Sequence, residues 1–284
     1  MSRKITFKGS PLTLVGRSLK TGILAPHFRV VSQDLLEVNY SDFSGKIKMI
    51  TSFPSLDTPV CDLQVKEFNK RAAQISSEVI IIGISKDLPF AQKRFCSMNE
   101  IKNEIVLSDY KYSSFGINYG LLIKELNLLA RSVFIIDKND TIRYMQIVGE
   151  LTNTPDYEDV LKNLDIVIKD PALPLQETRL PSQCVPCEGE VLPLPKAKIE
   201  ELLAQSHDWE LVDDKKIVKE FKFTDFTEAK YFLDLVSAIA QDQGHHPTLT
   251  IIYNKLKITL TTHAAAGLTE NDFIMAGIID ELAG

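Results

Sequence analysis

Six of the chain's thirteen prolines fall between residues 171 and 195. Proline has no backbone N–H and a fixed φ, so neither a regular helix nor a central strand tolerates such a density. The 284 residues are enough to bury two hydrophobic cores. The sequence therefore predicts a first domain at 1–170, a proline-rich linker at 171–195, and a second domain at 180–284 that overlaps the end of the linker.

The first part of the chain alternates apolar strand patterns with helical patterns. The predicted strands are residues 47–53, 79–85 and 132–137, and the predicted helices are residues 62–75 and 156–168. Residues 5–16 indicate a hairpin that turns at Gly9-Ser10-Pro11. Strands that alternate with helices predict an α/β domain whose central sheet is covered on both faces.

The second part has a different order of patterns. The predicted helices are residues 196–206 and 226–241, and the predicted strands are residues 215–223, 248–253 and 257–262, the last two joined at Asn254. Thr269 and Asp272 are spaced to cap a final helix. This order predicts a small α+β domain with an antiparallel sheet covered by helices.

Charge and hydropathy exclude several classes of partner. Residues 1–170 hold 22 Lys and Arg against 20 Asp and Glu, whereas residues 171–284 hold 10 against 18. Neither balance suits a phosphate backbone, so no nucleic-acid partner is expected. No run approaches the roughly 20 apolar residues of a membrane span, and no secretory signal follows Met1. We expect a cytoplasmic protein with no membrane contact.

Cys61 is the first candidate catalytic residue. It follows a buried-strand pattern and stands at the start of a helical one, where unpaired N–H groups and the helix dipole favour a thiolate. Thr58 lies three residues earlier, close enough for its hydroxyl to reach the sulfur. On composition alone, the alternative is a buried structural cysteine.

Three segments around this cysteine resemble the thiol peroxidase subgroup of the peroxiredoxins. They are PSLDTPVC at 54–61, DLPFAQKRFC at 87–96 and RSVFIIDKND at 131–140, and the resemblance extends over about residues 1–168. It implies a thioredoxin-like peroxiredoxin fold. It also implies that Cys61 reduces hydrogen peroxide or alkyl hydroperoxides and becomes a sulfenic acid.

The same resemblance assigns roles to the neighbouring residues. Cys96 would resolve the sulfenic acid as an intramolecular disulfide that thioredoxin then reduces. Thr58 and Arg131 would activate the sulfur, and Pro54 would shield it from water. The alternatives are a surface ion pair for Arg131, a strand stop for Pro54, and a redox sensor or holdase for the whole domain.

A disulfide requires Cα atoms within about 7 Å of each other. Cys61 and Cys96 are predicted to begin on different helices. We therefore predict that the first turns of both helices loosen during turnover.

His245, His246 and His263 are three of the five histidines in the chain. The first two follow a predicted helix and the third ends a predicted strand, so they can converge. The alternatives are a polar helix end for the pair and an edge-strand position for His263. Adjacent histidines point in different directions and no carboxylate stands at ligand spacing, so no metal is expected.

The segment GHHPTLTIIYNKLKITLTTHAAAGLTENDF at 244–273 resembles pterin-4a-carbinolamine dehydratases. The resemblance implies dehydration of a 4a-hydroxytetrahydropterin to the quinonoid dihydropterin, without a cofactor. We assign His245 and His263 to proton transfer and His246 to holding the pterin. Tyr253 and Asp272 also match the family and are assigned to substrate binding, the alternative for Asp272 being a helix N-terminal anion. The competing hypothesis is a non-catalytic module for dimerisation or partner binding.

Cys184 and Cys187 form a lone CxxC pair. One pair cannot close a tetrahedral zinc site, and the flanking residues do not predict the strand-to-helix context of a thioredoxin motif. A sharper hypothesis is that the pair passes electrons to the Cys61–Cys96 disulfide. Both resembled families form oligomers, so a homo-oligomer is expected.

Overall fold

A computed structural model describes the chain over residues 3–72, 76–170, 183–185 and 191–283. The chain divides into two compact units, Met1–Glu177 and Thr178–Gly284. Of the predicted linker, residues 183–185 and 191–195 are described. Within the described ranges, no helix is both long and apolar enough to cross a membrane.

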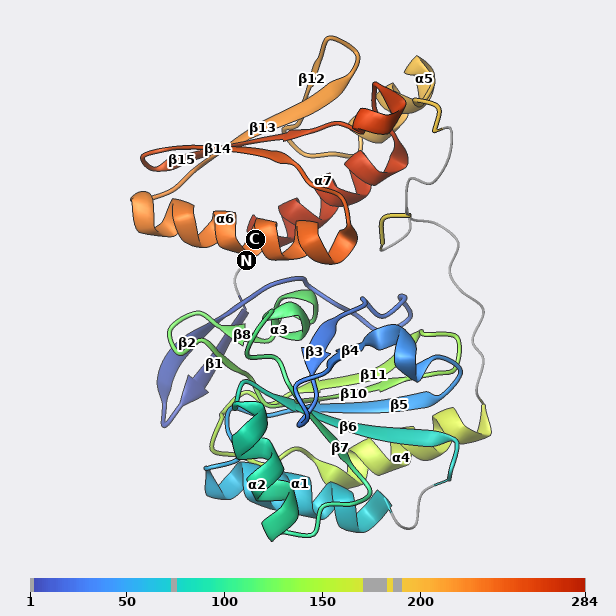
Figure 1. Cartoon of the computed structure of the whole chain (residues 1–284), viewed down its shortest axis with the longest axis vertical. Coiled ribbons are helices and arrows are strands. Elements are labelled where there is room, and N and C mark those ends of the chain that lie inside the picture. Colours follow the sequence, from blue (N-terminus) through green and yellow to red (C-terminus); the bar gives the residue numbers. More distant parts are fainter. Residues whose placement is uncertain (1–2, 73–75, 171–182, 186–190, 284) are drawn as a thin grey trace. The chain divides into compact units, whose positions relative to one another are not determined.

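The first unit contains a seven-stranded sheet in the order β11-β10-β5-β6-β7-β3-β4 (Figure 1). In that order the strands span Ile142–Ile147, Ser132–Ile136, Ile47–Ser52, Val79–Ser85, Ile105–Ser108, Arg29–Val31 and Glu37–Asn39. Strands β5, β6 and β7 pair in parallel, and the flanking strands pair antiparallel. The helical segments are η1 (Tyr40–Phe43), α1 (Pro59–Ala72), α2 (Pro89–Met98), α3 (Ser114–Asn118) and α4 (Tyr157–Lys169).

Both faces of this sheet are buried, as predicted. Ile50 of β5 belongs to one core cluster, whereas its neighbour Met49 belongs to another that includes Phe68 of α1 and Val160 of α4. Successive residues of a strand point to opposite faces, so β5, β6 and β10 contribute to both clusters. Helix α4 begins where the Asp156 side chain accepts a hydrogen bond from the Asp159 N–H. The predicted α/β class is confirmed.

A second sheet in this unit has the order β1-β2-β8-β9. Its strands are Arg3–Phe7, Ser10–Val15, Leu122–Ile123 and Leu128–Leu129. The predicted hairpin is present, but the predicted turn is wrong: Ser10 pairs with Phe7 inside the strands. The turn is Lys8-Gly9, because both residues have the positive φ that a two-residue hairpin turn requires.

The second unit is a four-stranded antiparallel sheet in the order β12-β13-β15-β14. In that order its strands are Glu210–Val212, Lys216–Lys222, Lys255–Leu260 and Thr248–Ile252. The helical segments are α5 (Lys196–Leu203), α6 (Phe226–Gln243), η2 (His263–Ala265) and α7 (Glu270–Ala283). Helices α6 and α7 pack on the sheet (Figure 1).

Side chains along β15 alternate between the core, where the helices pack, and solvent. Leu256, Ile258 and Leu260 are buried, while Lys255 before them and Lys257 between the first two are exposed. This is the pattern of a strand with one face on a core and the other in solvent. The predicted α+β class is confirmed.

Candidate active sites

Cys61 is the third residue of α1, and a short loop connects this helix to the end of β5. The first helical hydrogen bond runs from the Asp62 N–H to the Thr58 carbonyl, at 3.0 Å. Pro59 then occupies the first helical position, where a missing N–H costs nothing. The cysteine side chain is fully buried. Sequence reasoning therefore placed this residue correctly at a helix N-terminus.

Two polar groups contact the Cys61 sulfur. The Thr58 hydroxyl lies 2.8 Å from Sγ and the Arg131 Nη2 lies 3.4 Å from it. The same hydroxyl is 3.0 Å from the Ser55 carbonyl, so its single proton goes to one of these two acceptors. When the sulfur is a thiolate, Thr58 and Arg131 can both donate to it.

Arg131 is buried and fixed by other parts of the fold. Its Nη1 donates to Gln64 Oε1 at 2.6 Å, and its Nη2 also donates to the Leu151 carbonyl at 3.1 Å. Only 1% of the residue is exposed, so the alternative of a surface ion pair is wrong. The Nε is buried and has no hydrogen-bond partner among the described residues. The three hydrogen bonds above use three of the five guanidinium N–H groups, so the Nε–H and one Nη1–H are left to donate.

Two residues of this site were not identified from the sequence. Gln64, one helical turn after Cys61, holds the guanidinium. Asp87 accepts hydrogen bonds from the Ser55 hydroxyl at 2.6 Å and the Leu56 N–H at 2.8 Å, and so fixes the loop before the helix. Pro54 is buried at the start of that loop. The sequence offered a signal for Gln64 alone, because a polar residue on the apolar face of a predicted helix is expected to have a specific partner.

Cys96 lies on α2, so the two cysteines are on different helices, as predicted. Both are reduced, and both belong to one apolar cluster with Phe53, Leu56, Val65 and Val106. Cys96 is in the last turn of α2, however, and not in its first turn as expected. Burial raises the pKa of its thiol to about 11, although Gln33 Nε2 donates to the sulfur at 3.3 Å.

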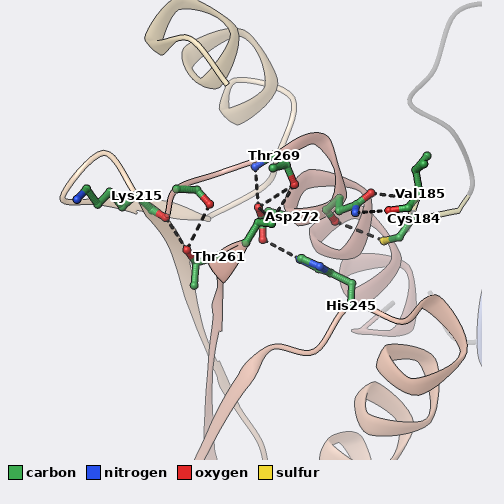
Figure 2. Close-up of polar contacts among 10 residues, drawn as sticks. Cys184, Val185, Lys215, His245, Thr261, Thr269 and Asp272 are labelled. Atoms are coloured by element: carbon green, nitrogen blue, oxygen red, sulfur yellow. Dashed lines mark hydrogen bonds and ion pairs between the residues drawn. The ribbon is translucent and has the colours of Figure 1, made fainter. Parts of the chain in front are cut away.

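His245 is the buried histidine of the second unit. It follows Gly244, whose left-handed backbone ends α6, and its Nε2 lies 2.8 Å from Asp272 Oδ1 (Figure 2). The other Asp272 oxygen accepts hydrogen bonds from the Thr262 hydroxyl and the Thr269 N–H, both at 2.8 Å. The predicted pairing of Thr269 with Asp272 at the start of α7 is confirmed.

This geometry corrects the assignment of Asp272 to substrate binding. The residue is 0% exposed, and both oxygens are occupied by protein donors. Asp272 therefore orients His245 and the start of α7 and has no surface to offer a substrate.

His246 and His263 are exposed at one end of the β14-β15 hairpin. Thr248 pairs with Thr259, so the residues before β14 and after β15 lie at the same end. The Thr261 hydroxyl donates to the Lys215 carbonyl at 2.8 Å and fixes the chain just before His263 (Figure 2). His246 Nε2 lies 3.2 Å from Gln241 Oε1.

Tyr253 is not brought to these histidines within the chain. It lies in the turn at the other end of the hairpin, where 69% of it is exposed. The five residues of β14 separate the two ends by roughly 17 Å. The assignment of Tyr253 to substrate binding stays a prediction.

Residues 183–185 form hydrogen bonds with residues next to His245 and Asp272. The Cys184 N–H donates to Gln243 Oε1 at 2.8 Å, and Val185 exchanges two hydrogen bonds with the Asn271 side chain, at 2.9 and 2.7 Å (Figure 2). Gln243 is two residues before His245, and Asn271 precedes Asp272. Cys187 lies outside the described residues. Across the ranges that are described, no group of three His, Cys, Asp or Glu side chains could hold a metal ion.

Comparison with known proteins matches the two parts of the chain to two families. Residues 20–161 match Redoxin, and residues 192–282 match pterin 4 alpha carbinolamine dehydratase. The thiol peroxidase of Staphylococcus saprophyticus is 50% identical over 159 residues, which are 56% of this chain and 96% of that protein.

Two solved structures are similar to parts of the chain. A peroxiredoxin-like protein from Aquifex aeolicus is 42% identical, covers 59% of this chain and 98% of its own, and has a TM-score of 0.55. A transcriptional coactivator/pterin dehydratase from Brucella melitensis is 34% identical, covers 32% of this chain and 99% of its own, and has a TM-score of 0.32.

Proposed function

Because the chain belongs to the Redoxin family through its thiol peroxidase part and carries a pterin 4 alpha carbinolamine dehydratase domain after it, we propose that one polypeptide catalyses two reactions. The first is thioredoxin-dependent reduction of hydrogen peroxide or alkyl hydroperoxides. The second is dehydration of a 4a-hydroxytetrahydropterin. We place the domains at 1–170 and 180–284, joined through the linker at 171–195.

In the first reaction the Cys61 thiolate attacks one peroxide oxygen. The S–O bond forms as the O–O bond breaks, which leaves a sulfenic acid on Cys61 and releases water or an alcohol. Arg131 stabilises the charge that develops on the departing oxygen, and its Nε, which has no hydrogen-bond partner in the described part of the chain, supports this role. Thr58 donates to the sulfur before the attack, and buried Pro54 limits access of water.

Cys96 then completes the oxidation. Its sulfur attacks the sulfenic sulfur of Cys61, the disulfide forms, and the hydroxyl leaves as water. Thioredoxin returns both thiols by disulfide exchange. Because both cysteines are buried on separate helices, α1 and α2 have to rearrange locally for this step.

The observation that carries the peroxidase proposal is the simultaneous contact of the Cys61 sulfur with Thr58 and with the fixed guanidinium of Arg131. The test is peroxide-dependent NADPH consumption in the presence of thioredoxin and thioredoxin reductase. Sustained consumption is expected with the wild-type chain and none with Cys61→Ser. If the cysteines only sense peroxide and do not catalyse its reduction, NADPH consumption would stop after about one equivalent per protein chain.

In the second reaction, breaking the C4a–OH bond requires an acid for the leaving hydroxyl and a base for a ring-nitrogen proton. His246 and His263 are exposed at one end of the hairpin and can serve these roles. We propose that the His245–Asp272 pair positions the loop that carries His246. This replaces proton transfer by His245, because the Asp272 contact and 8% exposure leave that ring little access.

The test of the second activity is a dehydratase assay on the full chain. His263→Ala is expected to lower kcat by roughly 10²-fold or more, as for loss of a general acid or base. Asp272→Asn is expected to lower dehydratase activity, because it releases His245. Asp234→Asn, at an exposed position of α6, is the control and should leave the activity unchanged. A wild-type chain without dehydratase activity would favour the non-catalytic dimerisation or partner-binding module.

A further inference from the structure

A short segment of the predicted linker is bound to the second unit, and we call its residues 183–185 the strap. The strap lies before residues 192–282, which match the dehydratase family, and neither proposed reaction assigns it a role. None of its three residues is buried, and 63% of Val185 is exposed. Apolar packing therefore does little to hold the strap in place, and hydrogen bonds have to do so.

Two side chains of the second unit hold the strap by its backbone (Figure 2). Gln243 Oε1 accepts a hydrogen bond from the Cys184 N–H at 2.8 Å. Asn271 Oδ1 accepts from the Val185 N–H at 2.9 Å, and Asn271 Nδ2 donates to the Val185 carbonyl at 2.7 Å. The Cys184 thiol adds a longer contact, 3.6 Å from the Asn271 carbonyl oxygen. Both amide side chains belong to buried residues, and such groups destabilise a fold when they lack hydrogen-bond partners.

The two side chains stand at the helix ends that the His245–Asp272 pair also connects. Gln243 is the last residue of α6, two positions before His245. Asn271 is the second residue of α7, directly before Asp272. The contact of 2.8 Å between His245 Nε2 and Asp272 Oδ1 joins the same two elements. The strap is therefore a second connection between the end of α6 and the start of α7.

We propose that the strap is a positioning element of the dehydratase site, with Gln243 and Asn271 as its positioning residues. It holds the end of α6 against the start of α7 and so keeps His245 in contact with Asp272. His246 follows directly and takes its place from this arrangement. The inference rests on the proposed dehydratase reaction, in which His246 serves as an acid or a base.

The surroundings of His246 explain why this site needs such support. The residue is exposed, and its Nε2 lies 3.2 Å from Gln241 Oε1 of α6. The place of the ring therefore follows the end of α6, which the strap fixes. An acid or base displaced by about 1 Å can lose on the order of 10²-fold in rate, so precise placement matters for this reaction.

The test breaks the pairing of the strap from each side in the full chain. Val185→Pro removes the N–H that donates to Asn271, and Asn271→Ala removes the partner. We expect each variant to lower dehydratase kcat by roughly 10- to 10²-fold and to leave KM unchanged, because the strap positions the acid and base and does not bind the pterin. The double variant should be no slower than the slower single variant, since both changes remove the same hydrogen bonds. Leu192→Pro, at a linker position that is 77% exposed, is the control and should keep the wild-type kcat.

Two further measurements separate positioning from stability. Circular dichroism at the assay temperature gives the folded fraction of each variant, and peroxide reduction by the same samples should stay at the wild-type rate. A wild-type kcat in Val185→Pro, additive losses in the double variant, or a loss that only follows the unfolded fraction would overturn the inference and leave the proposed dehydratase intact. A wild-type chain without dehydratase activity would overturn the proposed reaction and this inference with it.

Discussion

Arg131 is the side chain on which the reactivity of Cys61 most depends after the sulfur itself. Its guanidinium contacts the sulfur, the Gln64 amide and the Leu151 carbonyl at once. A lysine ammonium lacks the planar fork and cannot reproduce this set of contacts. We expect Arg131→Lys to lower the second-order rate with hydrogen peroxide by roughly 10²- to 10³-fold.

Competition kinetics against a peroxidase of known rate would measure this change. Arg71→Lys, near the end of α1, is the matched control. Thermal melts of both variants would establish that they are folded. An Arg131→Lys chain as fast as the control would show that the guanidinium is not part of the reaction.

Glu104, a buried carboxyl group that immediately precedes β7, makes the stability of the first unit depend on pH. Because burial raises its pKa to about 8 from an ordinary value of 4.5, the folded state holds this proton more tightly than the unfolded state. The free energy of unfolding of the first unit should therefore fall as pH rises from about 4.5 to about 8, by up to about 4 kcal/mol, and stop falling above that range.

Denaturant titrations of reduced protein at pH 5 and pH 8 would check this slope. Glu104→Gln should largely remove it, since the amide does not titrate. A slope that is the same in wild type and variant would assign the pH dependence to other groups.

Cys61 and Cys96 are buried in one packed cluster but lie on different helices, α1 and α2, so we expect oxidation to disturb both helices. A disulfide needs Cα atoms within about 7 Å. We expect hydrogen exchange in the oxidised protein to become faster in the first turn of α1 and in the last turn of α2. Helix α4, which carries no cysteine, is the internal control. Equal protection in both redox states would mean that the disulfide forms without local unfolding.

Periodicity predicted the strongly patterned helices and strands well. The strand β6 was predicted residue for residue, and α4 to within one residue at each end. Short strands such as β3, β8 and β9 were not predicted, because two or three residues carry no period and their pairing depends on distant partners. The predicted thioredoxin-like peroxiredoxin fold and the α+β domain are both confirmed.

The candidate sites were predicted unevenly for a physical reason. Thr58 and Cys61 share one turn, so their spacing alone brings them together. Gln64 could be suspected as a buried polar residue, but its bond to Arg131 joins residues 67 positions apart. Tyr253 was predicted to stand just before the turn at Asn254, and the structure has it in that turn, at the end of the hairpin away from His246 and His263.

The division of the chain into two units predicts that its two activities can be removed separately. In the full chain, Cys61→Ser should abolish peroxide reduction and leave dehydratase kcat and KM unchanged. His263→Ala should do the reverse. Parallel assays of both variants and the wild type would measure this, and loss of both activities in either variant would contradict independent sites.

The most direct test of Cys61 as the peroxide-reducing nucleophile is the mass of the reduced chain after one equivalent of hydrogen peroxide. The wild type should lose two hydrogen atoms, with the disulfide mapped to Cys61 and Cys96. Cys96→Ser should gain one oxygen atom on Cys61, and Cys61→Ser should remain unchanged over the same time. A Cys61→Ser chain that still consumes peroxide at the wild-type rate would contradict the account.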